Sequence, residues 1–464
     1  MATKKRKHRK GMEQDKEPET VFEDRISELP EAIIIHILSF LPTLNAVRTS
    51  LLSKRWRHMW TSVPAIDICD SRDIPCLRRR DEGNSGRKKF YNFVDMCLKH
   101  QYADTTISKF RLSVNYYGGS SRVDDWLRFL GKKTVQELEL HVLPMKARYC
   151  LPHSIINFRS LTLIKLTGLA LVNFAPTSLP SLKELCLSYI QMDDRVLNNL
   201  LLSCIFLETL QVHYCYGLVN PKVSSLSLES LDFKTGGMTC YCHTLEVEAI
   251  NLHSFAFEQS GGSRSKKCDI NLVHCSRIRN LSLSKAFLTD QWFKVLIPQL
   301  PHLESLKLKD CYGFQHIKIW NQNLRNFDFT LHSQWDSPEA TIDAPNLAYF
   351  CYTGYSLLKI SVNAPNLLDI YIEVTDHIRK TYDVAWYTCL IEFLSEFNSS
   401  KNVSVFCCNE KALIIPDELK KMHSSPLPDL KHMKVKTGSR PFRKAMLQKS
   451  LLWIAPSNLE KFPF

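Results

Sequence analysis

The chain has 464 residues, of which 44% are hydrophobic and 23% charged, close to the values of ordinary globular proteins. The longest apolar run, AIIIHILSFL at residues 32–41, is too short for a membrane helix, which needs about 20 apolar residues. The segment MATKKRKHRK carries charge where a secretion signal needs an apolar core. We therefore expect two or three folded modules or one large repeat domain, neither secreted nor embedded in a membrane.

The net charge of +13 is concentrated in two basic runs, one near the amino terminus and one in CLRRRDEGNSGRKK at residues 76–89. Residues 1–21 are predicted to be a disordered basic tail. Such runs are often nuclear import signals, which suggests that the protein is in the nucleus, the cytoplasm or both. The candidate import residues are Lys4, Lys5, Arg6 and Lys7.

The first predicted folded element is an apolar module at residues 22–68. Pro30 suits the first turn of a helix, where a missing N–H costs nothing, and Pro42 ends that helix. Two further short helices are predicted within TLNAVRTSLLS and SKRWRHMWTS, the second with Trp56 and Trp60 on one face. The aliphatic side chains of the first helix recur at helical spacing: Ile33, Ile34, Ile37, Leu38 and Leu41.

Three helices of this length should not be able to enclose that stripe and both tryptophans. Domains below about 40 residues usually need a metal, a disulfide or a partner, and no cysteine precedes Cys69. Each large aliphatic side chain left in water forfeits about 1.5–3 kcal/mol. We therefore expect a partner protein to cover the stripe, although docking on the chain's own carboxy-terminal part would satisfy the same physics.

The module resembles the F-box, whose pattern is Leu-Pro, an apolar helix ending ILSFLP, then LSKRWR and a tryptophan. All of these occur in order between Leu29 and Trp60. The resemblance implies binding to a Skp-type adaptor and, through it, to a cullin–RING ubiquitin ligase. Carried over by position, the implied adaptor contacts are Leu29, Pro30, Ile34, Ile37, Leu38, Leu41, Lys54 and Trp56.

Residues 69–104 are predicted to be a linker. Its first part contains the basic loop RRRDEGNSG, and RKKFYNFVDMCLKH reads as an amphipathic helix. This helix has Phe90, Phe93, Val94 and Cys97 on one side. We expect it to dock the F-box to the first repeat.

Residues 105–375 contain a repeated hexad of apolar, two residues, apolar, one residue, apolar. Examples are LTLIKL from Leu161, LESLDF from Leu228 and LESLKL from Leu303. The spacing falls within the leucine-rich-repeat period of roughly 20–29 residues. The last two apolar positions alternate with polar ones, which is typical of a strand. The expected fold class is α/β, a three-helix F-box followed by a leucine-rich-repeat solenoid, a horseshoe with parallel strands on its concave face.

The alternate strand positions should point onto the concave face and offer a polar surface for a target protein. Fewer than a third of them are expected to matter energetically. The candidate substrate-binding residues are His213, Asp232, Lys307, Lys309, Asp328, Tyr349 and Tyr371.

Residues 376–464 are predicted to hold further repeats and a cap. AWYTCLIEFLSEFNSS reads as a helix, NVSVFC as a strand, and AMLQKSLLWIAP as a capping helix with Leu447, Leu451 and Leu452 facing inward. This order resembles the FBD region of plant F-box/leucine-rich-repeat proteins. Capping the exposed end of the core is the simplest role for it.

No motif in the sequence predicts catalysis, a metal site or a cofactor. The cluster CYCH, at Cys240, Cys242 and His243, lacks further ligands at matched spacing. Phosphate-binding glycine motifs, nucleophile elbows and HExxH are missing. The expected function is therefore non-catalytic: the substrate-recognition subunit of a Skp–cullin–F-box ubiquitin ligase. Two alternatives are a scaffold that delivers no substrate and, with less support because no basic stripe carries interleaved aromatic residues, a nucleic-acid-associated protein.

Overall fold

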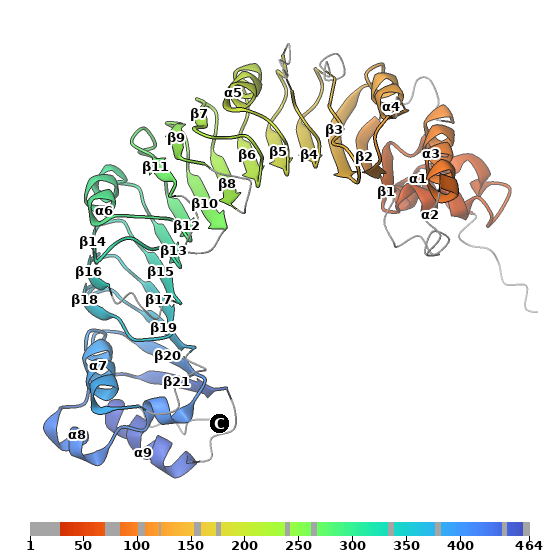
Figure 1. Cartoon of the computed structure of the whole chain (residues 1–464). Coiled ribbons are helices and arrows are strands. Elements are labelled where there is room, and N and C mark those ends of the chain that lie inside the picture. The colour runs from red at the N-terminus through yellow and green to blue at the C-terminus, as the bar shows by residue number, and fades with distance from the viewer. Residues whose placement is uncertain are drawn as a thin grey trace, which may run out of the picture.

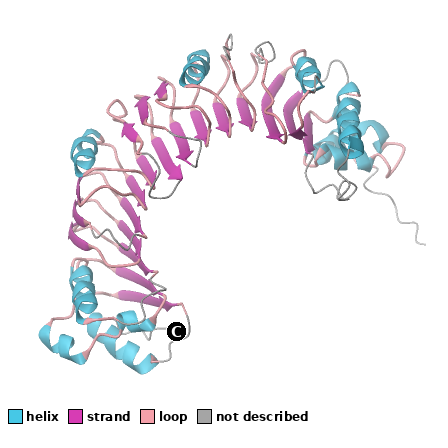
Figure 2. Cartoon of the chain, in the orientation of Figure 1, coloured by secondary structure: helices cyan, strands magenta, loops and turns pink. Residues whose placement is uncertain are grey.

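The computed structural model describes residues 28–69, 84–100, 107–119, 122–152, 159–172, 178–236, 242–260, 267–332, 338–375, 382–438 and 443–457. Its elements follow one another along an arc, with parallel strands on the inner, concave side (Figure 1). Helices gather at the two ends and at intervals on the outer, convex side (Figure 2). The predicted solenoid of parallel strands is confirmed.

Within the described residues, fifteen parallel strands form one sheet on the concave face. Its strands, in spatial order, are β1 (Ala65–Cys69), β2 (Ile107–Tyr116), β3 (Val135–Pro144), β4 (Leu163–Thr167), β5 (Glu184–Ser188), β6 (Thr209–His213), β8 (Ser230–Gly236), β10 (Ser254–Ser260), β12 (Asn280–Ser284), β13 (Ser305–Lys309), β15 (Asn326–Leu331), β17 (Tyr349–Gly354), β19 (Asp369–Val374), β20 (Asn402–Cys407) and β21 (His432–Thr437). Neighbouring strands are also successive concave strands along the chain, as expected when each coil of a solenoid contacts only the next.

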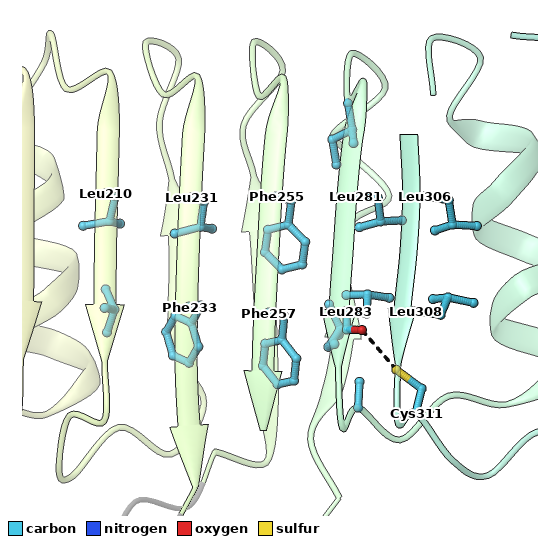
Figure 3. Packing of buried hydrophobic residues seen from close by; sticks show 14 of the residues in the cluster. Leu210, Leu231, Phe233, Phe255, Phe257, Leu281, Leu283, Leu306, Leu308 and Cys311 are labelled. Carbon is cyan, nitrogen blue, oxygen red and sulfur yellow. Dashed lines mark hydrogen bonds between the residues drawn. The ribbon is translucent and has the colours of Figure 1, made fainter. Parts of the chain in front are cut away.

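The core consists of two ladders of apolar side chains that run across the strands. Leu210, Leu231, Phe255, Leu281 and Leu306 are in register with one another and are buried. A second ladder two residues further along contains Phe233 and Phe257, whose rings stack 6.3 Å apart (Figure 3). No coil can bury its leucines alone, so the core forms only when the coils stack.

Buried thiols extend this packing at the carboxyl ends of the strands. The Cys311 thiol donates a hydrogen bond to the Leu283 carbonyl of the previous coil, with a sulfur–oxygen distance of 3.3 Å (Figure 3). Cys215 makes the equivalent bond to Leu187 at 3.5 Å. Burial raises the pKa of Cys311 to about 12, so this thiol stays protonated and serves as a donor.

The convex side carries helices on some coils and short strands on others. The helices α5 (Asp194–Ser203) and α6 (Asp290–Leu296) lie there, α6 being extended by the 3-10 helix η4 (Ile297–Gln299). Six further coils contribute one described strand each to two three-stranded parallel sheets, one of β7 (Lys222–Ser224), β9 (Thr244–Glu248) and β11 (Asp269–Asn271), the other of β14 (His316–Trp320), β16 (Glu339–Asp343) and β18 (Lys359–Asn363). Their alternation of buried and exposed residues is visible in HIKIW and EATID, and the sequence analysis missed it.

The amino-terminal module contains α1 (Glu31–Ser39), α2 (Thr43–Thr49) and the 3-10 helix η1 (Trp56–Ser62). It continues directly into β1, which pairs with β2 and is the first strand of the large sheet. The Asp67 N–H donates to the Thr43 hydroxyl at 2.8 Å, which ties α2 to β1. The module is therefore built onto the solenoid.

The predicted docking helix is present as α3 (Asn84–Lys99). Phe90, Val94 and Cys97 are buried, as its amphipathic pattern suggested. It packs against α4 (Arg122–Leu130), where the Trp126 indole N–H donates to the Asp95 carboxylate at 2.6 Å. At its other end, the ring of His100 lies 6.2 Å from that of Trp60. The basic residues 78–80 of the predicted loop lie outside the described residues.

The carboxy-terminal end contains α7 (Val384–Ser395), the 3-10 helix η5 (Glu410–Leu413), α8 (Asp417–Met422) and α9 (Lys444–Ile454) around β20 and β21. In the predicted capping helix α9, Leu447 and Leu451 are fully buried. The prediction that Leu452 faces inward was wrong, because it is 50% exposed and lies on the opposite side of the helix from Leu447.

None of the helices built from the described residues has the length and apolar character needed to cross a bilayer.

Candidate functional site

The stripe of the first helix is divided between two faces. Ile33 and Ile37, one turn apart on α1, are 46% and 40% exposed, and the stripe continues onto Phe40 at 74% and Leu41 at 36%. We call these four residues the α1 face. Residues this apolar on one exposed helix face indicate an interaction site.

The other half of the stripe is buried by the chain itself. Ile34 and Leu38 are fully buried and Trp56 is 3% exposed, which corrects the expectation that these three residues contact an adaptor directly. They form a core with Trp60 and with Ile66 of β1. The three helices alone are too short to cover the stripe, but the strand β1, which was not predicted and in which buried residues alternate with partly buried ones, completes the core.

The remaining predicted adaptor residues are accessible. Pro30 and Lys54 are exposed and Leu29 is partly buried. Pro30 precedes α1, and its carbonyl accepts hydrogen bonds from the Ile33 and Ile34 N–H groups at 3.0 and 3.1 Å. The sequence analysis did not place three exposed residues in the site, Phe40, Leu51 at 86% and Leu52 at 68%, although all three lie within the quoted F-box motif.

The predicted concave residues form two separate groups rather than one site. In the first, the His213 ring nitrogen Nε2 lies 2.8 Å from Asp232 Oδ2. The Lys234 ammonium lies 3.5 Å from the same oxygen. Burial opposes ionisation of Asp232, but the hydrogen bond and charge of His213 and the charge of Lys234 outweigh it and lower the pKa.

The second group lies further along the sheet. Lys307 pairs with Asp328 on the neighbouring strand at 2.8 Å, and Lys309 is exposed on the same strand. Tyr349 is 38% exposed, and the Tyr371 hydroxyl donates to the Glu373 carboxylate at 3.1 Å. This group therefore has a basic end and an end with phenolic and carboxylate groups.

Strands β10 and β12 separate the two groups and present mostly short side chains to the concave face. These are Ser254, Ala256 and Ser260 on β10, and Asn280, Ser282 and Ser284 on β12; the longer side chain on β10 is Glu258, whose carboxylate lies 4.0 Å from the Lys285 ammonium. With neighbouring strands about 4.8 Å apart, β8 and β13 are about 14 Å apart. One small ligand cannot contact both groups, whereas a protein surface can.

The amino-terminal part of the concave face carries a lattice of ion pairs that the sequence analysis did not identify. Lys109 lies 3.2 Å from Glu137 and 3.0 Å from Glu139, and Arg111 lies 3.4 Å from Glu139. The sequence does contain a signal for these ion pairs, because residues of opposite charge stand at alternate positions of successive hexads. Because these charges neutralise one another, this part of the sheet offers little net charge to a partner.

Among the residues that the structure describes, no three His, Cys, Asp or Glu side chains are grouped to hold a metal ion. Cys242 is buried, and its thiol donates to the Thr244 carbonyl at 3.3 Å. Cys240 and the import residues Lys4, Lys5, Arg6 and Lys7 lie outside the described residues.

Comparison with known proteins identifies two regions of the chain. Residues 26–65 match the F-box domain, and residues 123–279 match the model described as FBD-associated F-box protein At5g56370, LRR repeats. The first match covers α1 to the start of β1, and the second covers α4 to the residues just before β12. Neither of these two matches includes residues 376–464, so their FBD-like character stays a prediction.

Similar proteins of Arabidopsis thaliana have the same two parts in their names. The putative F-box/LRR-repeat protein At3g18150 is 26% identical over 77% of this chain and 73% of its own length. The putative F-box/LRR-repeat protein At5g41840 is 34% identical over 40% of this chain and 36% of its own length. The F-box/LRR-repeat protein At4g14096 is 30% identical over 53% of each chain. With its α1 face and its stacked parallel coils, the chain carries a segment that matches the F-box domain and repeats that match an F-box-associated LRR model, and it is similar to the F-box/LRR-repeat proteins of Arabidopsis thaliana.

Proposed function

We propose that the chain is the substrate-binding subunit of a Skp–cullin–F-box ubiquitin ligase. The α1 face binds a Skp-type adaptor, and the concave sheet binds the target protein. The observation that supports this proposal is the exposed apolar α1 face within a segment that matches the F-box domain. Burying such side chains against a partner recovers about 1.5–3 kcal/mol for each fully covered residue.

The connection between the two surfaces fits this role. Strand β1 belongs both to the core under α1 and to the sheet, so strand pairing joins the core of the F-box directly to the first coil. A target on the concave face is then held at a fixed position relative to the ligase. Holding two reactants in this way makes their encounter effectively intramolecular.

Adaptor binding is tested by replacing both exposed isoleucines, Ile33→Asp with Ile37→Asp. We expect capture of a Skp-type adaptor by the purified full chain to fall at least about tenfold, because two charges would be buried in the interface. The thermal unfolding midpoint should change little, since both positions face solvent.

The matched control is Leu202→Asp with Leu226→Asp, two residues on the convex side that are 69% and 80% exposed. This variant should capture the adaptor as the wild type does. Equal capture by the isoleucine variant and the wild type would rule out the α1 face as the adaptor site.

Target delivery needs a second readout, because a scaffold would bind the adaptor equally well. Proximity labelling under proteasome inhibition should yield proteins that become ubiquitinated with the wild-type chain and not with the isoleucine variant. If labelled partners show the same ubiquitination and lifetime with both chains, the protein is a non-degradative scaffold.

A further inference from the structure

A cavity lies among the helices at the carboxy-terminal end of the solenoid. These helices are at the opposite end of the arc from α1 (Figure 1). The volume of the cavity is about 450 Å³, and residues of α7, η5, α8 and α9 line it. The buried side chains of Ile415, Tyr387 and Ser450 form its deep part. The Tyr387 hydroxyl donates to the Lys411 carbonyl at 2.9 Å, and the Ile415 N–H donates to the Ser450 hydroxyl at 3.0 Å. The walls are thus held in place by hydrogen bonds.

The rim of the cavity is strongly basic. Four cationic side chains line it, Lys411, Lys420, Arg443 and Lys449, against the single carboxylate of Asp417. Lys411, Arg443 and Lys449 are exposed, whereas the Lys420 side chain is only 11% exposed. Glu410 lies nearby but accepts from the Arg443 backbone N–H, at 3.1 Å.

Asp417 shows how the rim holds an anionic group. Its carboxylate lies 2.9 Å from the Lys449 ammonium and 3.2 Å from that of Lys420. Hydrogen bonds from Lys449 and Lys420 lower the pKa of Asp417. The Asp417 carboxylate is therefore ionised at neutral pH, and it forms ion pairs with two of the four cationic side chains.

We propose that this cavity binds an acidic segment of a partner protein, which places an apolar side chain among Tyr387, Ile414 and Met446 and its carboxylates on the basic rim. Charge complementarity favours an acidic occupant, because the rim carries more cations than Asp417 can neutralise. The distribution of the cations favours a chain segment over a free anion. The deep lysine is already paired with Asp417, and Lys411 and Arg443 are at the surface, where they can meet side chains of a segment that crosses the opening.

This site does not depend on adaptor binding, since the cavity and the α1 face lie at opposite ends of the arc (Figure 1). It assigns a binding role to the region for which the sequence suggested only capping. Whether the partner is a ubiquitination target or a regulator, the same acidic segment with an apolar side chain would be recognised.

The proposal is tested with a short fluorescein-labelled peptide in which Glu and Asp residues alternate with Leu and Phe. We expect it to bind the full-length chain with an affinity that falls as salt rises. Lys411→Glu with Arg443→Glu should weaken binding by about tenfold or more, because both attractive charges become repulsive. Asp417→Asn should strengthen binding, because it releases Lys420 and Lys449 for the peptide.

The matched control is Lys421→Glu, an exposed lysine on α8 that does not line the cavity. It should leave the peptide affinity close to that of the wild type. Adaptor capture by every variant is the folding control, since the α1 face is remote.

Three outcomes would overturn the proposal. The first is an equal loss of affinity with Lys421→Glu, which would mean nonspecific attraction to a basic surface. The second is weaker binding with Asp417→Asn. The third is displacement of the peptide by inorganic phosphate at concentrations comparable to the peptide's own, which would indicate a site for free anions. A matched peptide with Gln and Asn in place of the acids should bind much more weakly.

Discussion

Glu139 is the most buried acidic side chain of the ion-pair lattice, with 11% of its side chain exposed. Burial opposes its ionisation, but the hydrogen bond from Lys109 and the charges of Lys109, Lys165 and Arg111 exceed that effect and lower its pKa. A group whose pKa is lower in the folded state stabilises the fold above its unfolded pKa and loses that contribution as pH falls through the folded value.

Because folding lowers the pKa of Glu139, the stability lost in Glu139→Gln should depend on pH. Near neutral pH the variant should be less stable than the wild type by about 1 kcal/mol, the scale of a charge-assisted hydrogen bond. The difference should shrink as pH falls below the ordinary value of 4.5. Urea-unfolding midpoints of both proteins across this range are the measurement. In a Lys109→Met background, Glu139→Gln should lower the free energy of unfolding by less. A stability difference between Glu139→Gln and the wild type that does not vary with pH would contradict a stabilising role for the ionised Glu139.

The face on which a single side chain lies could be predicted from the sequence only where the alternation of apolar and polar residues along the element determined it. The concave placement of His213, Asp232 and Lys307 follows from strict alternation along a strand, which the structure shows. The burial of Ile34, Leu38 and Trp56 did not follow, because it depends on which neighbour covers a helix that is apolar over most of its surface. The carboxy-terminal cavity could not be predicted either, since its residues come from four separate elements.

At the scale of elements, helix α9 closes the carboxy-terminal end of the core. Leu447 and Leu451 are fully buried, while Leu452 is 50% exposed. Replacing both Leu447 and Leu451 with alanine should lower the free energy of unfolding by about 4 kcal/mol or more, since each buried leucine contributes about 2–5 kcal/mol.

The control for α9 is Leu452→Ala, which removes a side chain of the same size from the same helix. It should change stability by well under about 1 kcal/mol, because an exposed leucine leaves no cavity. Chemical unfolding followed by tryptophan fluorescence would measure both, with Trp453 on the helix as one reporter. Similar losses for the two variants would mean that α9 does not cap the core.

Elements with a long, regular pattern were identified from sequence, and short ones were missed. The hexads predicted the concave strands from β2 to β19, because repetition makes chance agreement implausible. β1 and the convex strands β7, β9 and β11 were not predicted. Each has three to five residues, too few for alternation to be distinguished from an irregular segment.

At the scale of the whole molecule, the F-box module also protects an edge of the sheet. β1 covers one side of β2, whose Phe110 and Leu112 are fully buried. An uncovered edge strand exposes unpaired backbone groups and favours association with other chains. The module therefore has a structural role besides binding.

Deleting residues 28–69 along with the preceding tail should cause the remaining solenoid to self-associate. Light scattering coupled to size-exclusion chromatography would detect this against a control that lacks only residues 1–27, which keeps β1 and should behave as the full chain does. A monomeric solenoid without β1 would show that the edge needs no cover.

The convex elements should influence where the solenoid bends. Where strands line both sides, hydrogen bonds fix the same spacing of about 4.8 Å inside and outside, so we expect the coils that carry convex strands to add little curvature. A helix is about 10 Å wide, so we expect α6, which lies between the two convex sheets in chain order, to add more curvature than a convex strand does. His213 and Asp232 lie on strands that precede α6, and Lys307 and Tyr371 lie on strands that follow it. A target that touches both groups must fit the curvature of the coils between them, so shortening or replacing α6 would alter target choice without changing any contact residue.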